Sequence, residues 1–244
     1  MRPPIVLWAV PRSVSTAFER VMRARGDLVV FSEPFSASYY FSEERVSDRF
    51  GEPSTPPSAH GWTRVVQELM AATEEGTVFV KDMAYHVSPW LGPELVANFQ
   101  NTFILRHPAH TLPSLKRLLP DFTLEEAGFE QQYRLMRLAL EASRDELIVI
   151  EGEALRRSPA AVVEGYCRRV GLSFLPESLR WQTGLLADWR RWEEWHGEVA
   201  ASTGIRPPRG SREPGPPEGV DLAVYASCLD YYEKMIELGR LSRG

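Results

Sequence analysis

Hydroxyl and basic side chains gather directly after a short apolar run near the start of the chain. The segment from Pro11 to Thr16 reads Pro-Arg-Ser-Val-Ser-Thr and follows the apolar residues Ile5–Ala9. Serine and threonine hydroxyls can donate to phosphate oxygens, and Arg12 can neutralise their charge. A strand, a polar turn and a helix direct backbone N–H groups at an anion in α/β proteins. The pattern predicts a phosphate-binding loop; the alternative is a strand–turn–helix that Ser15 merely caps.

The loop differs from that of nucleotide triphosphatases because it has neither glycine nor lysine. The pattern G-x-x-x-x-G-K-[ST] is absent, and with it the lysine that reaches the β- and γ-phosphates. No acidic partner for Mg²⁺ is evident in the sequence either. ATP hydrolysis is therefore not the natural interpretation.

A second basic residue stands at the end of another apolar run. Arg106 closes the run Thr102–Arg106, and Ser114 follows eight residues later in a helical segment. Because ligands of open α/β sheets collect at the carboxyl ends of strands, we expect Arg12 and Arg106 to face one crevice. Arg106 suits a bidentate phosphate contact, to which Ser114 could add a hydroxyl. Two anion sites fit a ligand phosphorylated at both ends better than a simple mononucleotide.

Four residues at the same predicted edge could take part in group transfer. His86 or Glu33 could remove a proton from an acceptor, with Asp82 ranked behind them, and Lys81 could stabilise charge on a bridging oxygen. The alternatives stay open at this point. His86 could be a loop histidine bonded to the backbone, Glu33 a carboxylate favoured at a helix start, and Lys81 a solvated side chain. His107 and His110 have no third partner that suggests itself, so we expect no metal site.

The elements that must position these residues alternate along the chain. Helical patterns separate short β-rich runs, which predicts an α/β fold with a central parallel sheet flanked by helices. Thr123 and Glu126 form a capping-box pattern that predicts one long helix to Ser143. The runs taken as strands are Ile5–Ala9, Leu28–Phe31, Thr77–Lys81, Thr102–Arg106 and Leu147–Glu151.

Length and composition predict a single domain over residues 1–244. The net charge of −5 argues against nucleic-acid binding, which needs surplus Lys and Arg. The two cysteines, Cys167 and Cys228, lie in apolar helical patterns, which indicates core residues in a reducing compartment. No secretory segment or membrane span is seen, so we expect a cytoplasmic protein with no membrane partner.

Two proline-rich segments, 42–60 and 204–219, are expected to be loops or lids over a ligand. For the first, a mobile surface loop is the alternative. For the second, Arg206, Arg209 and Arg212 favour contact with an anionic ligand.

The chain resembles the sulfotransferases that use 3′-phosphoadenosine 5′-phosphosulfate (PAPS). The matching motifs lie within about residues 5–175 and occur in the same order as in that family. The loop from Pro11 to Thr16 is similar to their P-[KR]-[ST]-G-[ST]-[ST], and Arg106 and Ser114 have the spacing of their 3′-phosphate motif. The stretch 147–172 resembles their late strand, E-D-L turn and following helix. The segment Glu33-Pro34-Phe35 resembles the E-P-[FL] of a bacterial group with the loop P-R-[SN]-x-S-T-A.

The resemblance implies a P-loop-like sulfotransferase fold and transfer of a sulfuryl group from PAPS to a hydroxyl of a small acceptor. The product would be adenosine 3′,5′-bisphosphate (PAP), and the mechanism needs no metal. Residues carried over to the 5′-phosphosulfate are Arg12, Ser13, Ser15 and Thr16. Residues carried over to the 3′-phosphate are Arg106 and Ser114.

Three departures from the family pattern matter. Val14 replaces the usual loop glycine, so we expect the loop to avoid positive φ there. Gly152 stands where many relatives have an aromatic residue near the adenine. Met83 occupies the place of the usual base, and His86 lies three residues further on. A non-catalytic nucleotide-binding or sensing relative and a kinase-like nucleotide enzyme remain the alternatives.

An aromatic cluster could line the acceptor pocket and would then favour an aromatic or apolar alcohol. Near Tyr39, Tyr40 and Phe41 the sequence is rich in aromatic residues. Trp189, Trp192 and Trp195 fall at helical spacing and are expected to serve core or lid packing.

Overall fold

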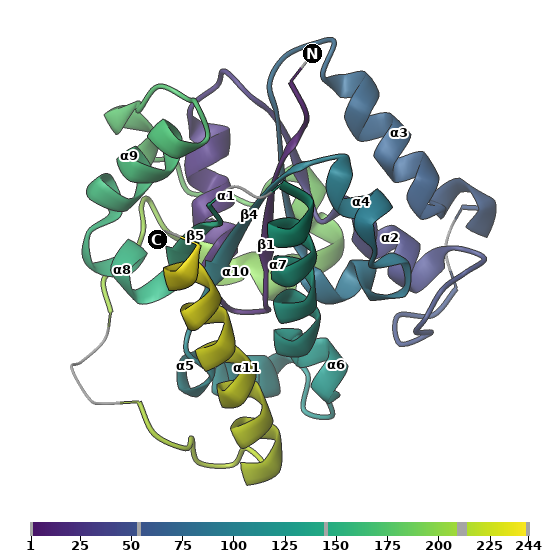
Figure 1. Cartoon of the computed structure of the whole chain (residues 1–244), viewed down its shortest axis with the longest axis vertical. Helices are drawn as coiled ribbons and strands as arrows, with labels where there is room; N and C mark the ends of the chain where they lie inside the picture. Colours follow the sequence, from purple (N-terminus) through teal and green to yellow (C-terminus); the bar gives the residue numbers. More distant parts are fainter. Residues whose placement is uncertain (1, 53–54, 144–145, 209–213, 243–244) are drawn as a thin grey trace.

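Five parallel strands form the centre of the computed structural model, which describes residues 2–52, 55–143, 146–208 and 214–242. Their order across the sheet is β2-β3-β1-β4-β5, and helices cover both faces (Figure 1). The predicted α/β fold is confirmed, with each strand within two residues of its predicted bounds. The strands are β1 (Ile5–Ala9), β2 (Val29–Ser32), β3 (Val78–Met83), β4 (Gln100–Leu105) and β5 (Ile148–Glu151).

The register brings the strand ends that carry chemistry to one edge of the sheet. Ala9 at the end of β1 is level with Met83 of β3 and Ile104 of β4. The chain leaves β1 to the side of β3 and β2, and later places β4 on the other side. The carboxyl edge beside β1 is thus a topological switch point, where ligands of such sheets bind.

Side chains of β1 alternate between two buried layers, because successive residues of a strand point to opposite faces. Val6 and Trp8 pack with one hydrophobic cluster, and Ile5 and Leu7 with the other. The first cluster includes α3 (Trp62–Ala72), α4 (Pro93–Ala97) and α7 (Phe129–Ser143). The second includes α1 (Ser15–Ala24) and α9 (Pro159–Arg169).

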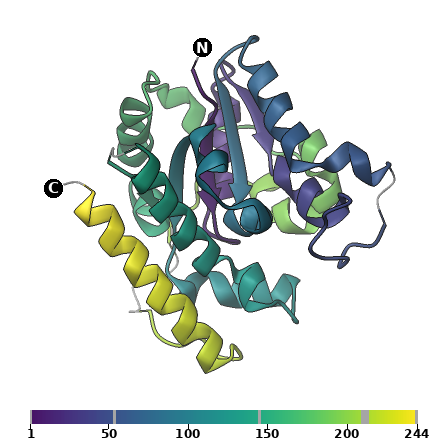
Figure 2. The same cartoon turned by 45° about the vertical axis from the view of Figure 1, so that its right-hand side comes forward.

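The remaining helices complete these layers and the edge above the sheet. Helix α11 (Leu222–Leu241) lies against α7 on the outside of the molecule (Figures 1 and 2). The others are α2 (Pro34–Phe41), α5 (Pro108–Leu118), α6 (Leu124–Ala127), α8 (Gly152–Arg157) and α10 (Glu193–Ala200), with 3₁₀ turns η1 (Pro57–His60), η2 (Ala84–Trp90), η3 (Pro176–Leu179) and η4 (Ala187–Trp192).

The prediction of one long helix from Thr123 to Ser143 is wrong in its length. The capping box between Thr123 and Glu126 is present, but it opens the four-residue α6. Gly128 then adopts φ 78°, and α7 begins at Phe129. A Cβ on Gly128 would lie 3.5 Å from the ring of Pro11, so this break in the helix passes close to the phosphate loop.

Cys167 and Cys228 are buried free thiols, as predicted. Among the residues that the structure describes, no helix combines the length and the hydropathy that crossing a membrane requires.

Candidate functional site

A pocket of about 300 Å³ opens at the carboxyl edge of the sheet. Its walls come from the segments that follow β1, β2, β3 and β4, and from α10, η4 and the 3₁₀ turn η2. Residues predicted from the sequence and found in its wall are Arg12, Ser15, Thr16, Glu33, His86, Arg106 and Ser114. The pocket thus brings together both halves of the predicted site, the anion-binding and the proton-transferring residues.

The phosphate loop has a strained backbone, and the expectation for Val14 is wrong. Val14 adopts φ 75° and ψ 8°, and Arg12 has φ 65°. Glu33, with φ 49°, is the third non-glycine residue at positive φ in the described ranges, and all three line the pocket. Because such conformations cost free energy, they persist where the surrounding structure holds them, typically at functional sites.

The hydroxyls of the loop differ in their placement. Ser15 and Thr16 begin α1 and line the pocket, and the ten-residue helix directs its free N–H groups toward this end. Ser15 makes no side-chain cap, and the N-cap position belongs to Val14. Ser13 is fully buried, lies outside the pocket wall, and its Oγ has no hydrogen-bond partner in the described part of the chain.

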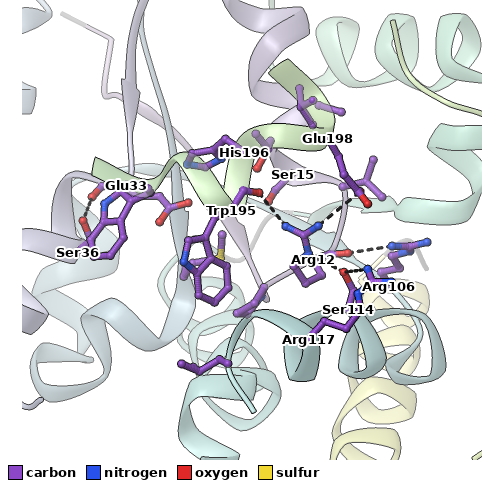
Figure 3. A pocket seen from close by; sticks show the side chains of 18 of the residues that line it. Arg12, Ser15, Glu33, Ser36, Arg106, Ser114, Arg117, Trp195, His196 and Glu198 are labelled. Carbon is purple, nitrogen blue, oxygen red and sulfur yellow. Dashed lines mark hydrogen bonds and ion pairs between the residues drawn. The ribbon is translucent and has the colours of Figure 1, made fainter. Parts of the chain in front are cut away.

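Arg12 is held by three neighbours at the pocket wall (Figure 3). Its Nε donates to Ser114 Oγ at 2.9 Å, and its Nη1 donates to the carbonyl of Trp195 at 2.8 Å. Its Nη2 lies 3.5 Å from a carboxylate oxygen of Glu198. Burial lowers the pKa of Arg12, while Glu198 counteracts this effect. Arg12 therefore joins the phosphate loop to α5 and α10.

Arg106 reaches the same loop from β4. Its Nη1 donates to the carbonyl of Arg12 at 3.0 Å, and its Nε donates to Glu153 at 2.9 Å. Glu153 also lies 3.3 Å from Arg156. Ser114 Oγ accepts from Arg12 and, at 3.3 Å, from Arg117. Arg12 and Arg106 line one pocket, as expected from the strand ends, and Ser114 lies in the same wall.

Two of the basic residues in this wall are not among those predicted from the sequence. Arg117 and Arg156 line the pocket, as does Arg206 of the segment 204–219. Within the described residues, the pocket wall holds five arginines and two glutamates, although the whole chain is acidic. The position of Arg117 could have been inferred from the sequence, because it lies three residues after Ser114 on the same helix.

Close packing around Gly152 explains why this position has a residue without a side chain. A Cβ at this position would lie 3.0 Å from the carbonyl oxygen of Ser13 and 3.2 Å from the Arg106 side chain and the Leu105 carbonyl. The absence of a side chain therefore lets the phosphate loop, β4 and α8 approach one another closely. An aromatic residue would not fit here.

Lys81 is not solvated, because its side chain is completely buried between two carboxylates. Its Nζ donates to Glu33 and lies 3.5 Å from Glu19. Burial alone would lower the pKa of Lys81, but the two glutamates raise it above its ordinary value. Burial likewise would raise the pKa of Glu33, but Lys81, His86 and His196 lower it to about 2. Lys81 lies beneath the pocket wall and reaches it through Glu33.

Glu33 does occupy the position before α2, yet its side chain makes no cap on that helix. Its carboxylate is committed to Lys81 instead. The backbone N–H of Glu33 donates to the Lys81 carbonyl at 2.7 Å. Main chain and side chain of Glu33 thus both face the end of β3.

His86 is bonded to a carboxylate rather than to the backbone. Its Nδ1 lies 2.7 Å from Asp82 Oδ1, and its ring is 2% exposed in the pocket wall. Asp82 is fixed by two backbone N–H groups, from Phe35 at 2.8 Å and from Met83 at 2.7 Å. An ionised carboxylate only accepts, so the Nδ1 of His86 carries the proton and Nε2 is left as an acceptor.

Helix α10 contributes a histidine that is not among the residues predicted from the sequence. His196 lines the pocket, is 3% exposed, and stacks on Trp189 with ring centroids 4.8 Å apart. Trp189 is core, as expected, whereas Trp192 and Trp195 line the pocket. Helical spacing could not reveal this, because the lining role depends on how η4 and α10 pack over the loop.

The two proline-rich segments have different contacts. In segment 42–60, Arg49 donates to Glu126 and Asp121, and Phe50 lines the pocket. In segment 204–219, Arg156 donates to the carbonyls of Arg206 and Pro207. Arg209 and Arg212 lie outside the described residues.

His107 has a structural contact in this region. Its Nδ1 accepts the N–H of Ala109 and caps α5. No group of three or more His, Cys, Asp or Glu side chains suited to a metal ion occurs in the described ranges.

Comparison with known proteins agrees with this architecture. Branched-chain-amino-acid aminotransferase-like proteins 2 and 1 of Arabidopsis thaliana are 23% and 25% identical over 92% and 83% of this chain. The chain spans only 40% and 36% of the lengths of these relatives. The sulfotransferase domain of the Synechococcus PCC 7002 olefin synthase has a TM-score of 0.53, with 15% identity and 96% of each chain covered.

The structural likeness, at 15% identity, concerns the fold. The family is shown by a model of the sulfotransferase domain, which matches residues 3–237. That range contains the whole pocket wall, from Pro11 to Arg206. The chain therefore belongs to the sulfotransferase domain family.

Proposed function

We propose that this chain transfers a sulfuryl group from PAPS to a hydroxyl group of a small acceptor. The observation that carries the proposal is the meeting of two groups in one pocket. Arg12 and Arg106, from different strands, stand beside the N-terminus of α1, and the His86–Asp82 pair lines the same cavity. Anion binding and proton removal are the two requirements of such a transfer.

The residues fit a donor with phosphates at both ends. The strained loop and the first turn of α1 offer backbone N–H groups and the hydroxyls of Ser15 and Thr16 to the 5′ end. Arg106 and Ser114, with Arg117 beside them, bind the 3′-phosphate. When bound, PAPS supplies the electrophilic sulfuryl group. Ser13 supports the loop from its buried position.

His86 is the base that the geometry favours. Asp82 holds its Nδ1–H, so Nε2 is free to take the acceptor proton. Glu33, with a pKa of about 2, stays ionised and is too weak a base near neutral pH. Its ion pair fixes Lys81 beneath the pocket wall, so Lys81 acts on the site by holding the Glu33 carboxylate in place.

Calorimetric titration tests the donor assignment. We expect PAP to bind more tightly than ADP or ATP, because only PAP carries the 3′-phosphate that Arg106 recognises. The variant Arg106→Ala should lose about tenfold or more in affinity for PAP, and much less for adenosine 5′-phosphate. Arg157→Ala is the control, since Arg157 is on the same helix as Arg156 but outside the pocket wall. A preference for ATP, or no binding of PAP, would refute the proposal.

The base assignment is tested by kinetics with a set of phenols and alcohols as acceptors. His86→Ala should lower kcat by about 100-fold or more while PAP affinity is retained. Glu33→Gln should still show a kcat that rises with pH, with only the midpoint moved by the loss of a neighbouring negative charge, because Glu33 takes no proton. Full turnover by His86→Ala would contradict the assignment. Binding of PAP without turnover of any acceptor by the wild type would favour a non-catalytic relative instead.

A further inference from the structure

Helix α10 places His196 at the junction of the two halves of the pocket. The charges that face its ring are Lys81 and Glu33 from the catalytic side, and Arg12 from the phosphate loop. Figure 3 shows the His196 ring above Trp195, with Glu33 to one side and Ser15 and Arg12 to the other. His196 therefore lies between the His86 side of the pocket and the loop Pro11–Thr16.

The hydrogen-bond partners of the His196 ring indicate which of its nitrogens carries the proton. Nδ1 is buried and has no hydrogen-bond partner in the described part of the chain. Among buried backbone groups, an N–H without an acceptor is rarer than a carbonyl without a donor, and the same cost of an unpaired donor applies to a ring nitrogen. The proton therefore belongs on Nε2, and the ring presents a donor rather than an acceptor to the pocket.

The ring is also neutral at physiological pH. Burial, together with Lys81 and Arg12, lowers the pKa of His196 to about 3, although Glu33 opposes this effect. A neutral donor suits a place that already has Lys81 and Arg12 close by, because a third cation there would be repelled. Stacking on Trp189, whose Nε1 donates to Glu19 at 3.2 Å, fixes the plane of the ring.

We propose that His196 is a catalytic residue that donates its Nε2–H to an oxygen of the transferring sulfuryl group. The inference rests on the proposed function, because it takes the loop at Pro11–Thr16 as the site of the phosphosulfate. His196 takes no proton from the acceptor and forms no bond to sulfur. It adds a hydrogen bond to the group in transit, while His86 receives the acceptor proton.

Three variants separate this role from a structural one. His196→Phe keeps a ring for stacking on Trp189 and removes both nitrogens. His196→Gln carries an amide N–H near the position of Nε2, and His196→Asn carries one near the position of Nδ1. Melting temperatures of all three show whether the fold is retained.

Calorimetry with PAPS and with PAP, in the absence of acceptor, gives the decisive comparison. His196→Phe should weaken PAPS binding by about tenfold and leave PAP binding unchanged, because PAP lacks the sulfuryl group. Turnover should fall by a similar or larger factor with the acceptor KM unchanged. His196→Gln should recover part of both losses, and His196→Asn should not.

Three outcomes would overturn the role of His196. Equal losses of PAPS and PAP affinity would show that the residue only supports the loop. Unchanged PAPS binding and turnover would show that it makes no contact. A rise in acceptor KM alone would assign it to the acceptor. Failure of the wild type to bind PAP is a separate result, which would refute the proposed function itself.

Discussion

Two residues of the phosphate loop adopt a backbone conformation that side chains rarely take. A glycine at the position of Val14 would reach positive φ without steric cost, whereas a β-branched side chain is disfavoured there. The conformation persists because the flanks of the loop are fixed. Arg106 binds the Arg12 carbonyl, and α1 begins immediately after Val14.

A pair of substitutions measures this strain. Val14→Gly and Val14→Ala both remove the partly buried side chain, but only glycine accommodates φ 75° without strain. We expect Val14→Gly to be more stable than Val14→Ala by about 1 kcal/mol in urea unfolding, because alanine keeps the left-handed penalty. At an ordinary φ the order is reversed, since glycine loses more chain entropy on folding. An alanine variant as stable as the glycine variant would contradict the strained conformation.

The shape of the pocket depends on the packing of three segments. The loop after β1, the end of β4 and the start of α8 lie close to one another. Gly152 permits this approach, and Arg106 and Glu153 bridge it with an ion pair. Opposite them, η4 and α10 carry Trp192, Trp195 and His196 over the pocket. The binding surface is therefore a product of packing between elements that lie far apart in the sequence.

Adding a methyl group at Gly152 tests this packing. Gly152→Ala should lower stability by about 1–3 kcal/mol, since the new Cβ meets two backbone carbonyl oxygens that cannot move freely. PAP affinity should fall as well, because the phosphate loop is displaced. Urea unfolding and calorimetry measure the two effects.

Gly165→Ala in α9 is the matched control. Nothing lies within 4 Å of a Cβ at Gly165, so the change should stabilise the protein by up to about 1 kcal/mol through helix propensity. If both alanine variants behave alike, the close approach at Gly152 is not what sets the loop position.

Burial of a titratable side chain in the pocket wall makes the free energy of unfolding of the whole protein depend on pH. Glu198 lies two residues from His196 on the same helix, and the charges of Lys81, Glu33 and Arg12 act on His196. Folding lowers its pKa to about 3, whereas an unfolded histidine titrates near about 6.5. Between these values the unfolded state binds a proton that the folded state does not.

Stability should therefore fall as the pH is lowered from about 6.5 toward 3, in part because of His196. We expect His196→Phe to show a shallower decline over this window in urea unfolding at stepwise pH. From pH 7 to 8.5 the two curves should run parallel, because the histidine is neutral in both states. Parallel curves below pH 6 would show that His196 titrates normally in the fold.

Much of the fold and of the candidate site followed from local pattern. Apolar runs indicated five strands, and basic residues at two strand ends indicated one crevice, because parallel strands share a carboxyl edge. Local pattern did not predict the position of a side chain where contacts with residues distant in the sequence determine it. Neither the burial of Lys81 between Glu19 and Glu33 nor the placement of His196 has a local signature.

By itself, the sequence determined the parallel sheet, the loop Pro11–Thr16 and the convergence of Arg12 with Arg106. Periodicity and residue type are local properties. Because the strands are parallel, the residues that follow them lie at the same edge of the sheet. Only the tertiary structure decided that Val14 is left-handed, that Ser13 faces the interior and that His86 pairs with Asp82. These outcomes depend on dense packing between distant segments, which fixes backbone angles and hydrogen-bond partners that the residues themselves leave open.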